Sequence, residues 1–91
     1  MEINVYTIPT CGWCTKLKDW LKKKKIAFIE HDLTESDHAR DEMIEKSDQF
    51  ATPVTIFKYY EDQKEDEELV LIKETVIVGF DEKKLEAALK E

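Results

Sequence analysis

The two cysteines of this chain stand together in one tetrapeptide, Cys11-Gly12-Trp13-Cys14, and the chain has no others. A disulfide that closes so short a loop removes little entropy from the unfolded chain, so disulfide bonds do not hold this fold together. The 91 residues, of which 42% are hydrophobic, must therefore be stabilised by an ordinary packed core. A chain of this length predicts a single domain over residues 1–91.

Acidic residues outnumber basic residues, with 21 Asp and Glu against 14 Lys and Arg and a formal net charge of -7. A surface of this charge repels phosphate, which argues against nucleic acid or an anionic membrane as a partner. No apolar run approaches the roughly 18 to 20 residues that a membrane span needs. The first residues, Met1-Glu2-Ile3-Asn4-Val5, lack the basic start and apolar stretch of a signal peptide. We therefore expect a cytoplasmic protein.

Apolar residues recur at helical spacing in three segments and form short apolar runs in four others. The helical positions are Trp13, Leu17, Trp20 and Leu21 in the first segment, Ala39, Met43 and Ile44 in the second, and Leu85, Ala88 and Leu89 in the third. The expected strands span 3–8, 26–29, 54–60 and 69–78, and a break at Lys73-Glu74 would divide the last of them. The acidic segment 61–68 has no apolar residue and predicts a solvent-exposed hairpin tip.

The helix boundaries are indicated by capping residues and charges. Thr10 is a candidate N-cap of the first helix, and the lysines of 22–25 lie at its negative end. Thr34 or Ser36 can cap a second helix that runs to about residue 49, and Gly79 with Asp81 starts the third. The resulting order is β-α-β-α-β-β-α, with the first two strands parallel and the last two in an antiparallel hairpin. We expect an α/β fold in which three helices flank a four-stranded mixed sheet.

The cysteine pair therefore lies between the first strand and the first helix. Unpaired N–H groups at a helix start favour an anion, and this position lowers a cysteine pKa from about 8.5 to as little as 3.5 to 7.5. A thiolate is the attacking species in disulfide exchange, so we interpret Cys11 as the nucleophile. Cys14 lies one turn further on, where it can attack a mixed disulfide on Cys11. We interpret it as the resolving thiol.

Two other interpretations of the pair are a buried structural pair and a zinc site. A zinc site would need two more ligands, and the spacing of His31 and His38 misses the usual finger pattern. We expect no metal site. Lys18, one turn after Cys14, is a candidate for electrostatic assistance to the thiolate.

Three short motifs follow one another along the chain. They are Val5-Tyr6-Thr7 before the cysteine tetrapeptide, then Thr52-Pro53-Val54, and then Val78-Gly79-Phe80-Asp81. With the predicted element order, the chain resembles the glutaredoxins and glutaredoxin-like redox proteins over nearly its whole length, apart from a longer acidic segment between the last two strands. The resemblance implies a thioredoxin fold, and a monomeric thiol–disulfide oxidoreductase that reduces protein or low-molecular-weight disulfides.

The resemblance also implies a binding site beside the cysteines. Pro53 would be cis and face Cys11, which leaves the backbone of Thr52 free to pair with a substrate in β fashion. Phe80 would supply a backbone N–H, and Asp81 a carboxylate, to the γ-glutamyl end of glutathione. Asp81 can also cap the last helix. The substrate-binding residues implied in this way are Trp13, Thr52, Pro53, Gly79, Phe80 and Asp81.

Several positions depart from the glutathione-dependent members of the family. Ile8 stands where a lysine is usual and Phe50 where an arginine or lysine is frequent, and both cations would pair with the glycine carboxylate of glutathione. The motif 78–81 is similar to that of carriers that take electrons from a thioredoxin reductase. Glutathione and a thioredoxin reductase are both candidate electron donors, and no other cofactor is required. Gly12 replaces a common proline, as in relatives that bridge a [2Fe–2S] cluster between subunits, so a cluster-binding carrier is the alternative function.

Overall fold

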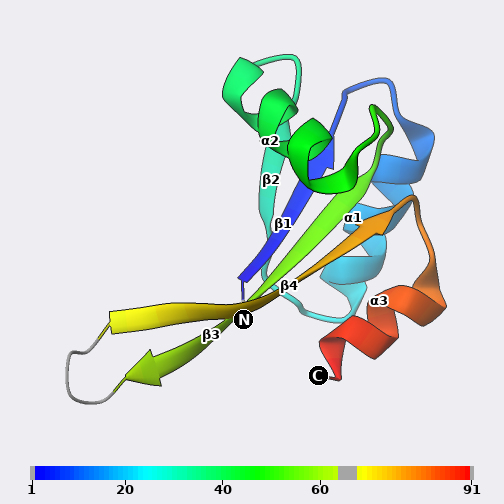
Figure 1. Ribbon diagram of the computed structural model, residues 1–91. Helices are drawn as coiled ribbons and strands as arrows, with labels where there is room; N and C mark the ends of the chain where they lie inside the picture. Colours follow the sequence, from blue (N-terminus) through cyan, green and yellow to red (C-terminus); the bar gives the residue numbers. More distant parts are fainter. Residues whose placement is uncertain (1, 64–67, 91) are drawn as a thin grey trace.

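The computed structural model of the protein describes residues 2–63 and 68–90. Its elements are β1 (Glu2–Thr7), α1 (Gly12–Lys23), β2 (Ile29–Asp32), α2 (Asp37–Ser47), β3 (Val54–Gln63), β4 (Glu68–Val78) and α3 (Glu82–Leu89). Figure 1 shows three helices packed around one twisted sheet, with the β3–β4 hairpin extending away from them. The predicted element order and α/β class are confirmed.

The four strands lie in the order β2-β1-β3-β4. β1 runs parallel to β2 and antiparallel to β3, and β3 and β4 form an antiparallel hairpin. β2 and β4 are therefore the edges of a mixed sheet. The parallel pairing of the first two strands and the antiparallel hairpin of the last two agree with the prediction. α1 and α3 cover one face of this sheet and α2 covers the other (Figure 1).

Alternate side chains of the strands form two separate cores, one on each face of the sheet. Beneath α1 and α3 the buried residues are Ile3, Val5, Leu17, Leu21, Phe57, Tyr59, Ile77, Leu85 and Ala88. Beneath α2 they are Tyr6, Leu33, Ala39, Met43, Val54 and Ile56. The predicted helical positions Leu17, Leu21, Ala39, Met43, Leu85 and Ala88 are all buried, whereas Ile44 is 39% exposed.

The second strand lies later in the chain than the sequence predicted. The apolar run 26–29 was expected to form it, but β2 covers Ile29–Asp32. Lys25 turns into the left-handed region at φ 59, and Ile26 N–H donates back to a carbonyl of α1. Ile26 and Phe28 then pack against the core beneath α1 and α3. The apolar run thus lies in the connection between α1 and β2, where two of its side chains cover that core. The residues that follow it, which are mostly polar, pair with β1 and form the strand.

The β3–β4 hairpin is longer than predicted. β3 continues to Gln63 and β4 begins at Glu68, so backbone pairing includes both ends of the acidic segment that was expected to be a tip. The rest of that segment, 64–67, lies outside the described residues. β4 also continues through Lys73 and Glu74, where a break was considered. The ladder has a bulge beside this point, because Tyr59 pairs with Lys73 and Tyr60 with Leu71.

The second helix is capped at both ends by its own sequence. Ser36 Oγ accepts a hydrogen bond from the backbone N–H of Ala39, which selects Ser36 rather than Thr34 as the N-cap. The helix ends at Ser47, slightly before the predicted residue 49, because Asp48 adopts a left-handed conformation at φ 58. Among the described helices, none has the length and apolar character required to cross a membrane.

Candidate redox site

The cysteine pair opens α1, and the first cysteine is itself the helix cap. Cys11 has extended backbone angles, and its Sγ accepts the backbone N–H of Cys14 at 3.1 Å. The predicted cap, Thr10, is exposed and lies one residue outside. The capping position of Cys11 matters chemically, because a capping side chain receives the unpaired N–H groups of the first turn directly. The Cys11 sulfur therefore lies where the field of α1 favours negative charge.

The two sulfurs differ in their access to solvent. Cys11 and Cys14 form a disulfide across a Cα–Cα distance of 5.2 Å. Cys11 is partly exposed, whereas Cys14 is only 1% exposed. A partner that approaches from outside can therefore reach the sulfur of Cys11 but not that of Cys14. The asymmetry agrees with the roles of nucleophile and resolving thiol that the sequence predicted, which remain functional assignments to be tested.

Most of the predicted substrate-binding residues meet in one surface hollow of about 230 Å³. Its lining consists of Trp13, Thr52, Pro53, Gly79 and Phe80. These residues come from the start of α1, the connection before β3 and the connection after β4, so the fold brings together three distant segments. Asp81 is not part of the lining.

Backbone geometry at the hollow agrees with two expectations. The Thr52–Pro53 peptide bond is cis, as the family resemblance implied. Gly79 has φ 85, a conformation that favours glycine, and its N–H donates to the Pro53 carbonyl at 2.7 Å. This hydrogen bond fixes the start of the last motif against the cis-proline turn. Asp81 then caps α3, because its carboxylate accepts the backbone N–H of Lys84 at 3.1 Å.

Three aromatic side chains extend this hollow along α1. The ring of Phe80 lies 6.4 Å from that of Trp13 and 6.3 Å from that of Trp20, measured between centroids. Trp13 is 58% exposed, so it flanks the hollow on the surface as the resemblance implied. Trp20 is partly buried and packs against the core beneath α1 and α3, as its helical spacing predicted, but the sequence interpretation did not place its ring beside a hollow. The seven-residue separation from Trp13 was the available signal, since it places both rings on one side of the helix.

Beyond Phe80 lies a second hollow of about 260 Å³. It is lined by Lys16, Asp19, Trp20, Lys23, Phe80 and Glu82. Phe80 belongs to both linings, so the two hollows adjoin one another. Apart from Phe80, these residues were not predicted to contribute to a site. Their charges alone carry no such signal, because exposed helical lysines and acids are common.

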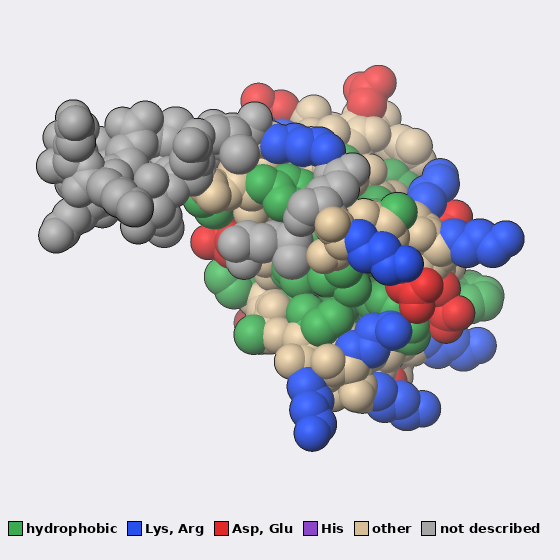
Figure 2. Space-filling model, turned by 90° about the horizontal axis from the view of Figure 1, so that it is seen from below, with side chains coloured by type: hydrophobic (Ala, Val, Ile, Leu, Met, Phe, Trp, Pro, Cys, Tyr) green, Lys and Arg blue, Asp and Glu red, His purple; other side chains and the backbone are tan. Residues whose placement is uncertain are grey.

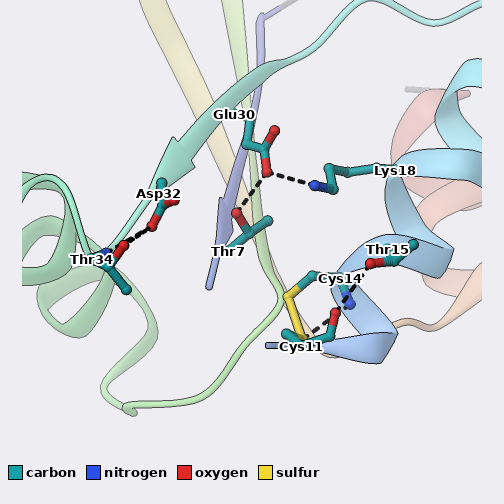
Figure 3. A network of polar contacts seen from close by, with 8 residues as sticks. All are labelled: Thr7, Cys11, Cys14, Thr15, Lys18, Glu30, Asp32 and Thr34. Atoms are coloured by element: carbon teal, nitrogen blue, oxygen red, sulfur yellow. Dashed lines mark hydrogen bonds and ion pairs between the residues drawn. A yellow bond between two sulfur atoms is a disulfide. The ribbon is translucent and has the colours of Figure 1, made fainter. Parts of the chain in front are cut away.

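A polar network links α1 to the first two strands near the cysteines (Figure 3). Glu30 on β2 accepts hydrogen bonds from Lys18 Nζ and from Thr7 Oγ1, each at 2.8 Å. The ammonium of Lys18, and then the hydroxyl of Thr7, hold the pKa of Glu30 below its usual value. Lys18, a candidate for electrostatic assistance to the thiolate, has its ammonium group against this carboxylate. The network attaches α1 to the sheet one turn after Cys14.

The positions that depart from the glutathione-dependent pattern have different environments. Ile8 packs against the core beneath α2. Phe50 is 65% exposed and therefore presents an apolar ring where a cation is frequent.

His31 stacks on Tyr6 at 4.7 Å, and its Nε2 lies 2.8 Å from Asn4 Oδ1. Within residues 2–63 and 68–90, no group of three or more His, Cys, Asp or Glu side chains has a metal-binding arrangement.

The fold and the site define a thioredoxin-fold protein with a CxxC pair at the start of its first helix. Similarity to known proteins agrees with this class. The thioredoxin-like protein BC3987 superimposes over 96% of this chain and 99% of its own, with a TM-score of 0.71 and 29% identity. A glutaredoxin from Archaeoglobus fulgidus superimposes over 99% of this chain and 87% of its own, with a TM-score of 0.71. At 17% identity, this second similarity supports the fold alone.

Sequence comparison identifies the family. The family model described as Glutaredoxin matches residues 3–58, which is more than half of the chain. A curated relative, the "Uncharacterized glutaredoxin-like 8.6 kDa protein in rubredoxin operon" of Clostridium pasteurianum, is 40% identical over 52 residues. That match covers 57% of this chain and 69% of the relative. The protein belongs to the glutaredoxin family, and its CxxC pair supports a thiol redox role.

Proposed function

We propose that the protein is a glutaredoxin-like thiol–disulfide oxidoreductase in which Cys11 is the nucleophile and Cys14 is the resolving thiol. One observation carries the proposal: the Cys11 sulfur caps α1, accepts the Cys14 N–H at 3.1 Å and is the more exposed of the two. This environment stabilises the thiolate, which is the reactive form of a cysteine.

The first step forms a mixed disulfide. The Cys11 thiolate attacks one sulfur of a substrate disulfide, so that a bond forms to Cys11 and the substrate S–S bond breaks. The departing sulfur leaves as a thiolate and takes a proton from solvent. The N–H groups of the first turn of α1 hold Cys11 in position for this attack, because they favour the charged sulfur before bond formation.

The second step releases the substrate. Cys14 loses its proton and its thiolate attacks the Cys11 sulfur, which forms the internal disulfide and expels the second substrate thiol. Two electrons have then passed from the cysteine pair to the substrate. The burial of Cys14 beneath the helix start directs it toward Cys11 and away from outside thiols. The bonded pair in the structure represents the product of this step.

The hollow beside the pair provides a binding surface for the substrate. Thr52 precedes the cis proline and lines the hollow, so its backbone is placed to pair with an extended peptide. The exposed ring of Trp13 and the ring of Phe80 would contact the substrate side chains or the glutathione moiety. Gly79 leaves space at the hollow, because a Cβ atom there would meet nothing within 4 Å.

The electron donor is proposed to be glutathione or a thioredoxin reductase. Ile8 and Phe50 provide no cation for the glycine carboxylate of glutathione, which favours the reductase. The oxidised protein would be offered glutathione with its own reductase, or NADPH with thioredoxin reductase. We expect faster reduction in the second mixture. Equal rates in both mixtures would remove the preference but leave the thiol chemistry intact.

Cysteine variants test the central assignment. With a disulfide-linked peptide as substrate, Cys14→Ser should accumulate a mixed disulfide that mass spectrometry detects as the sum of the two masses. Cys11→Ser should accumulate none, because Cys14 is buried. Both variants should be inactive in a turnover assay with a protein disulfide. Equal trapping by the two variants would contradict the assignment of Cys11 as the nucleophile.

A further inference from the structure

Positive charge is concentrated on one part of this acidic protein. Residues 12–25 contain six lysines and one aspartate, although the whole chain has 21 acidic and 14 basic residues. On the face seen from below, Figure 2 shows several Lys or Arg side chains around a patch of hydrophobic side chains, with acidic side chains also among them. Because lysines are gathered in one region, the local field there attracts anions although the net charge of the protein is negative.

The basic region is continuous with the redox site. Phe80 lines both the hollow beside the cis proline and the second hollow on α1. Its ring also lies between those of Trp13 and Trp20. A bound segment could therefore run from the cysteines, across Phe80, and onto the surface between Lys16 and Lys23. We refer to this path as the aromatic–lysine groove; it is lined by Trp13, Phe80, Trp20, Lys16 and Lys23, and Asp19 and Glu82 also border it.

The two lysines of the groove have ammonium groups available for a partner. Among ion pairs of the described residues, none involves Lys16 or Lys23. Lys16 Nζ lies 4.5 Å from the centre of the Trp13 ring, which holds the charge beside the hollow without neutralising it. Lys24, by contrast, contacts Glu86 at 3.2 Å and is not part of the groove lining.

We propose that the aromatic–lysine groove binds an acidic segment of the protein whose disulfide the cysteine pair exchanges with. The inference rests on the proposed function and specifies its substrate class. A carboxylate-rich segment next to the reacting cysteine would place its acids near Lys16 and Lys23, and an apolar side chain of the same segment would cover Phe80. Complementary charge of this kind raises the association rate more than the final affinity.

One feature favours a protein segment over a long polyanion. The rest of the chain is strongly acidic and would repel a nucleic acid that extended beyond the groove. A short acidic segment of a folded partner avoids this repulsion, because its charge is confined to a few residues. Asp19 and Glu82 line the second hollow beside the two lysines, so the acids of the segment must lie at the ammonium groups and away from these carboxylates.

The test compares disulfide-linked peptides that differ only in glutamate or glutamine beside the reacting cysteine. The second-order rate constant for their reaction with the reduced protein would be measured at low and high salt. At low salt we expect the glutamate peptide to react about tenfold faster. The advantage should disappear in about 1 M salt, where the Debye length falls to about 3 Å. A small uncharged disulfide reports the redox chemistry separately.

Matched charge variants locate the effect. Lys16→Gln with Lys23→Gln should slow the reaction of the glutamate peptide about three- to tenfold at low salt and leave the small disulfide within about twofold. The control is Lys22→Gln with Lys90→Gln, which removes the same charge from exposed positions outside the groove. Arginine at both groove positions should restore the wild-type rate, because it restores the charge.

Three outcomes would overturn the proposal. They are equal rates for the two peptides, equal losses in the groove and control variants, or inhibition by an oligonucleotide as strong as that by a cysteine-free acidic peptide. Failure to react with the small disulfide would instead contradict the proposed function itself. Circular dichroism of each variant would establish that the comparison is between folded proteins.

Discussion

The two faces of the sheet are stabilised by different kinds of contact. The core beneath α1 and α3 consists of apolar side chains and Tyr59, whose hydroxyl donates to the Ala88 carbonyl at 2.6 Å. Beneath α2, the buried Tyr6 donates to the carboxylate of Glu42 and stacks on His31. The helix that carries the cysteines is therefore held by an apolar core together with the partly exposed Lys18–Glu30 ion pair. On the opposite face, a hydrogen bond from the Tyr6 hydroxyl to the Glu42 carboxylate joins the sheet to α2.

The attachments of both helices respond to acidification. The hydrogen bond from Tyr6 holds the pKa of Glu42 below its usual value, and burial with that same bond raises the pKa of Tyr6. Lys18 and Thr7 likewise hold the pKa of Glu30 below its usual value. Protonation of Glu42 should therefore weaken the attachment of α2, and protonation of Glu30 the attachment of α1, both below the ordinary glutamate pKa of 4.5.

The largest expected loss of stability comes from substitutions that create a cavity on either face of the sheet. Leu17→Ala and Met43→Ala each remove a completely buried side chain and should each lower the free energy of unfolding by about 2 to 5 kcal/mol. Only Leu17→Ala should also slow the reaction of Cys11 with a disulfide, because Leu17 lies on α1. Urea unfolding and the reaction rate, measured below both unfolding transitions, check this. Equal slowing by both variants would remove the functional distinction between the faces.

A smaller effect is expected from Tyr6→Phe. Loss of the hydroxyl leaves Glu42 without its donor and should lower the free energy of unfolding at neutral pH by about 1 to 2 kcal/mol. The pKa of Glu42 is lowered in the folded protein, so its contribution is present above the ordinary value of 4.5 and is lost as the pH falls through the folded value. The variant should therefore lose less stability on acidification.

Tyr6 itself acts at the other end of the pH range. Its folded pKa is raised above the ordinary value of 10.0, so its contribution is present below that value and is lost as the pH rises further. Tyr6→Phe should flatten this alkaline decline as well. Urea unfolding from acid to alkaline pH measures both changes. Parallel curves for the variant and the wild type would show that the Tyr6–Glu42 pair is not coupled to folding.

The two caps provide a matched pair with effects of about 1 kcal/mol each. Ser36→Ala removes the side chain that caps α2, and Asp81→Ala removes the one that caps α3. If Asp81 also binds the glutathione ammonium, only Asp81→Ala should raise the KM for a glutathione mixed disulfide. Asp81→Asn keeps a capping oxygen and should raise the KM without the loss of stability. An unchanged KM in both Asp81 variants would show that Asp81 caps α3 and does not bind glutathione.

The smallest effect is expected at Lys18. Its ion pair with Glu30 is partly exposed, and such pairs contribute up to about 1 kcal/mol. Lys18→Gln should therefore lower the free energy of unfolding by less than that amount and leave the rate of Cys11 within about twofold. A much larger fall in the rate would restore the electrostatic role that the sequence suggested, despite the contact with Glu30.

Local signals explain why much of the fold was predictable. The helix of 12–23 has apolar residues at helical spacing, and its lysines lie at its end, so neighbouring residues in the sequence determine it. The same holds for the β-branched run that starts β3 and for the cap at Asp81. β2 was placed wrongly because Ile26 and Phe28 have strand-like composition, but their apolar side chains are used to cover the core beneath α1 and α3.

The candidate site was predictable only in part. Three short patterns can be recognised in the sequence without knowledge of the fold: the cysteine spacing, the proline that is cis in the structure, and the motif at 78–81. The structure brings residues of all three to one hollow. The contact between Lys18 and Glu30 could not be predicted, because Glu30 lies on a strand whose position was not known. Trp20 was assigned to the core, against which it packs, but helical spacing could not show that its ring also borders a hollow.

The amino-acid sequence by itself determined the order of elements, the position of the cysteine pair at a helix start and the family. These properties depend on residues that are close along the chain, where spacing and capping act directly. Tertiary structure alone decided which run became β2, which carboxylate met Lys18 and which aromatic rings surrounded Phe80. These outcomes depend on contacts between distant segments. The free energy of such contacts is determined by which segments compete for the same buried surface, and no single segment determines it.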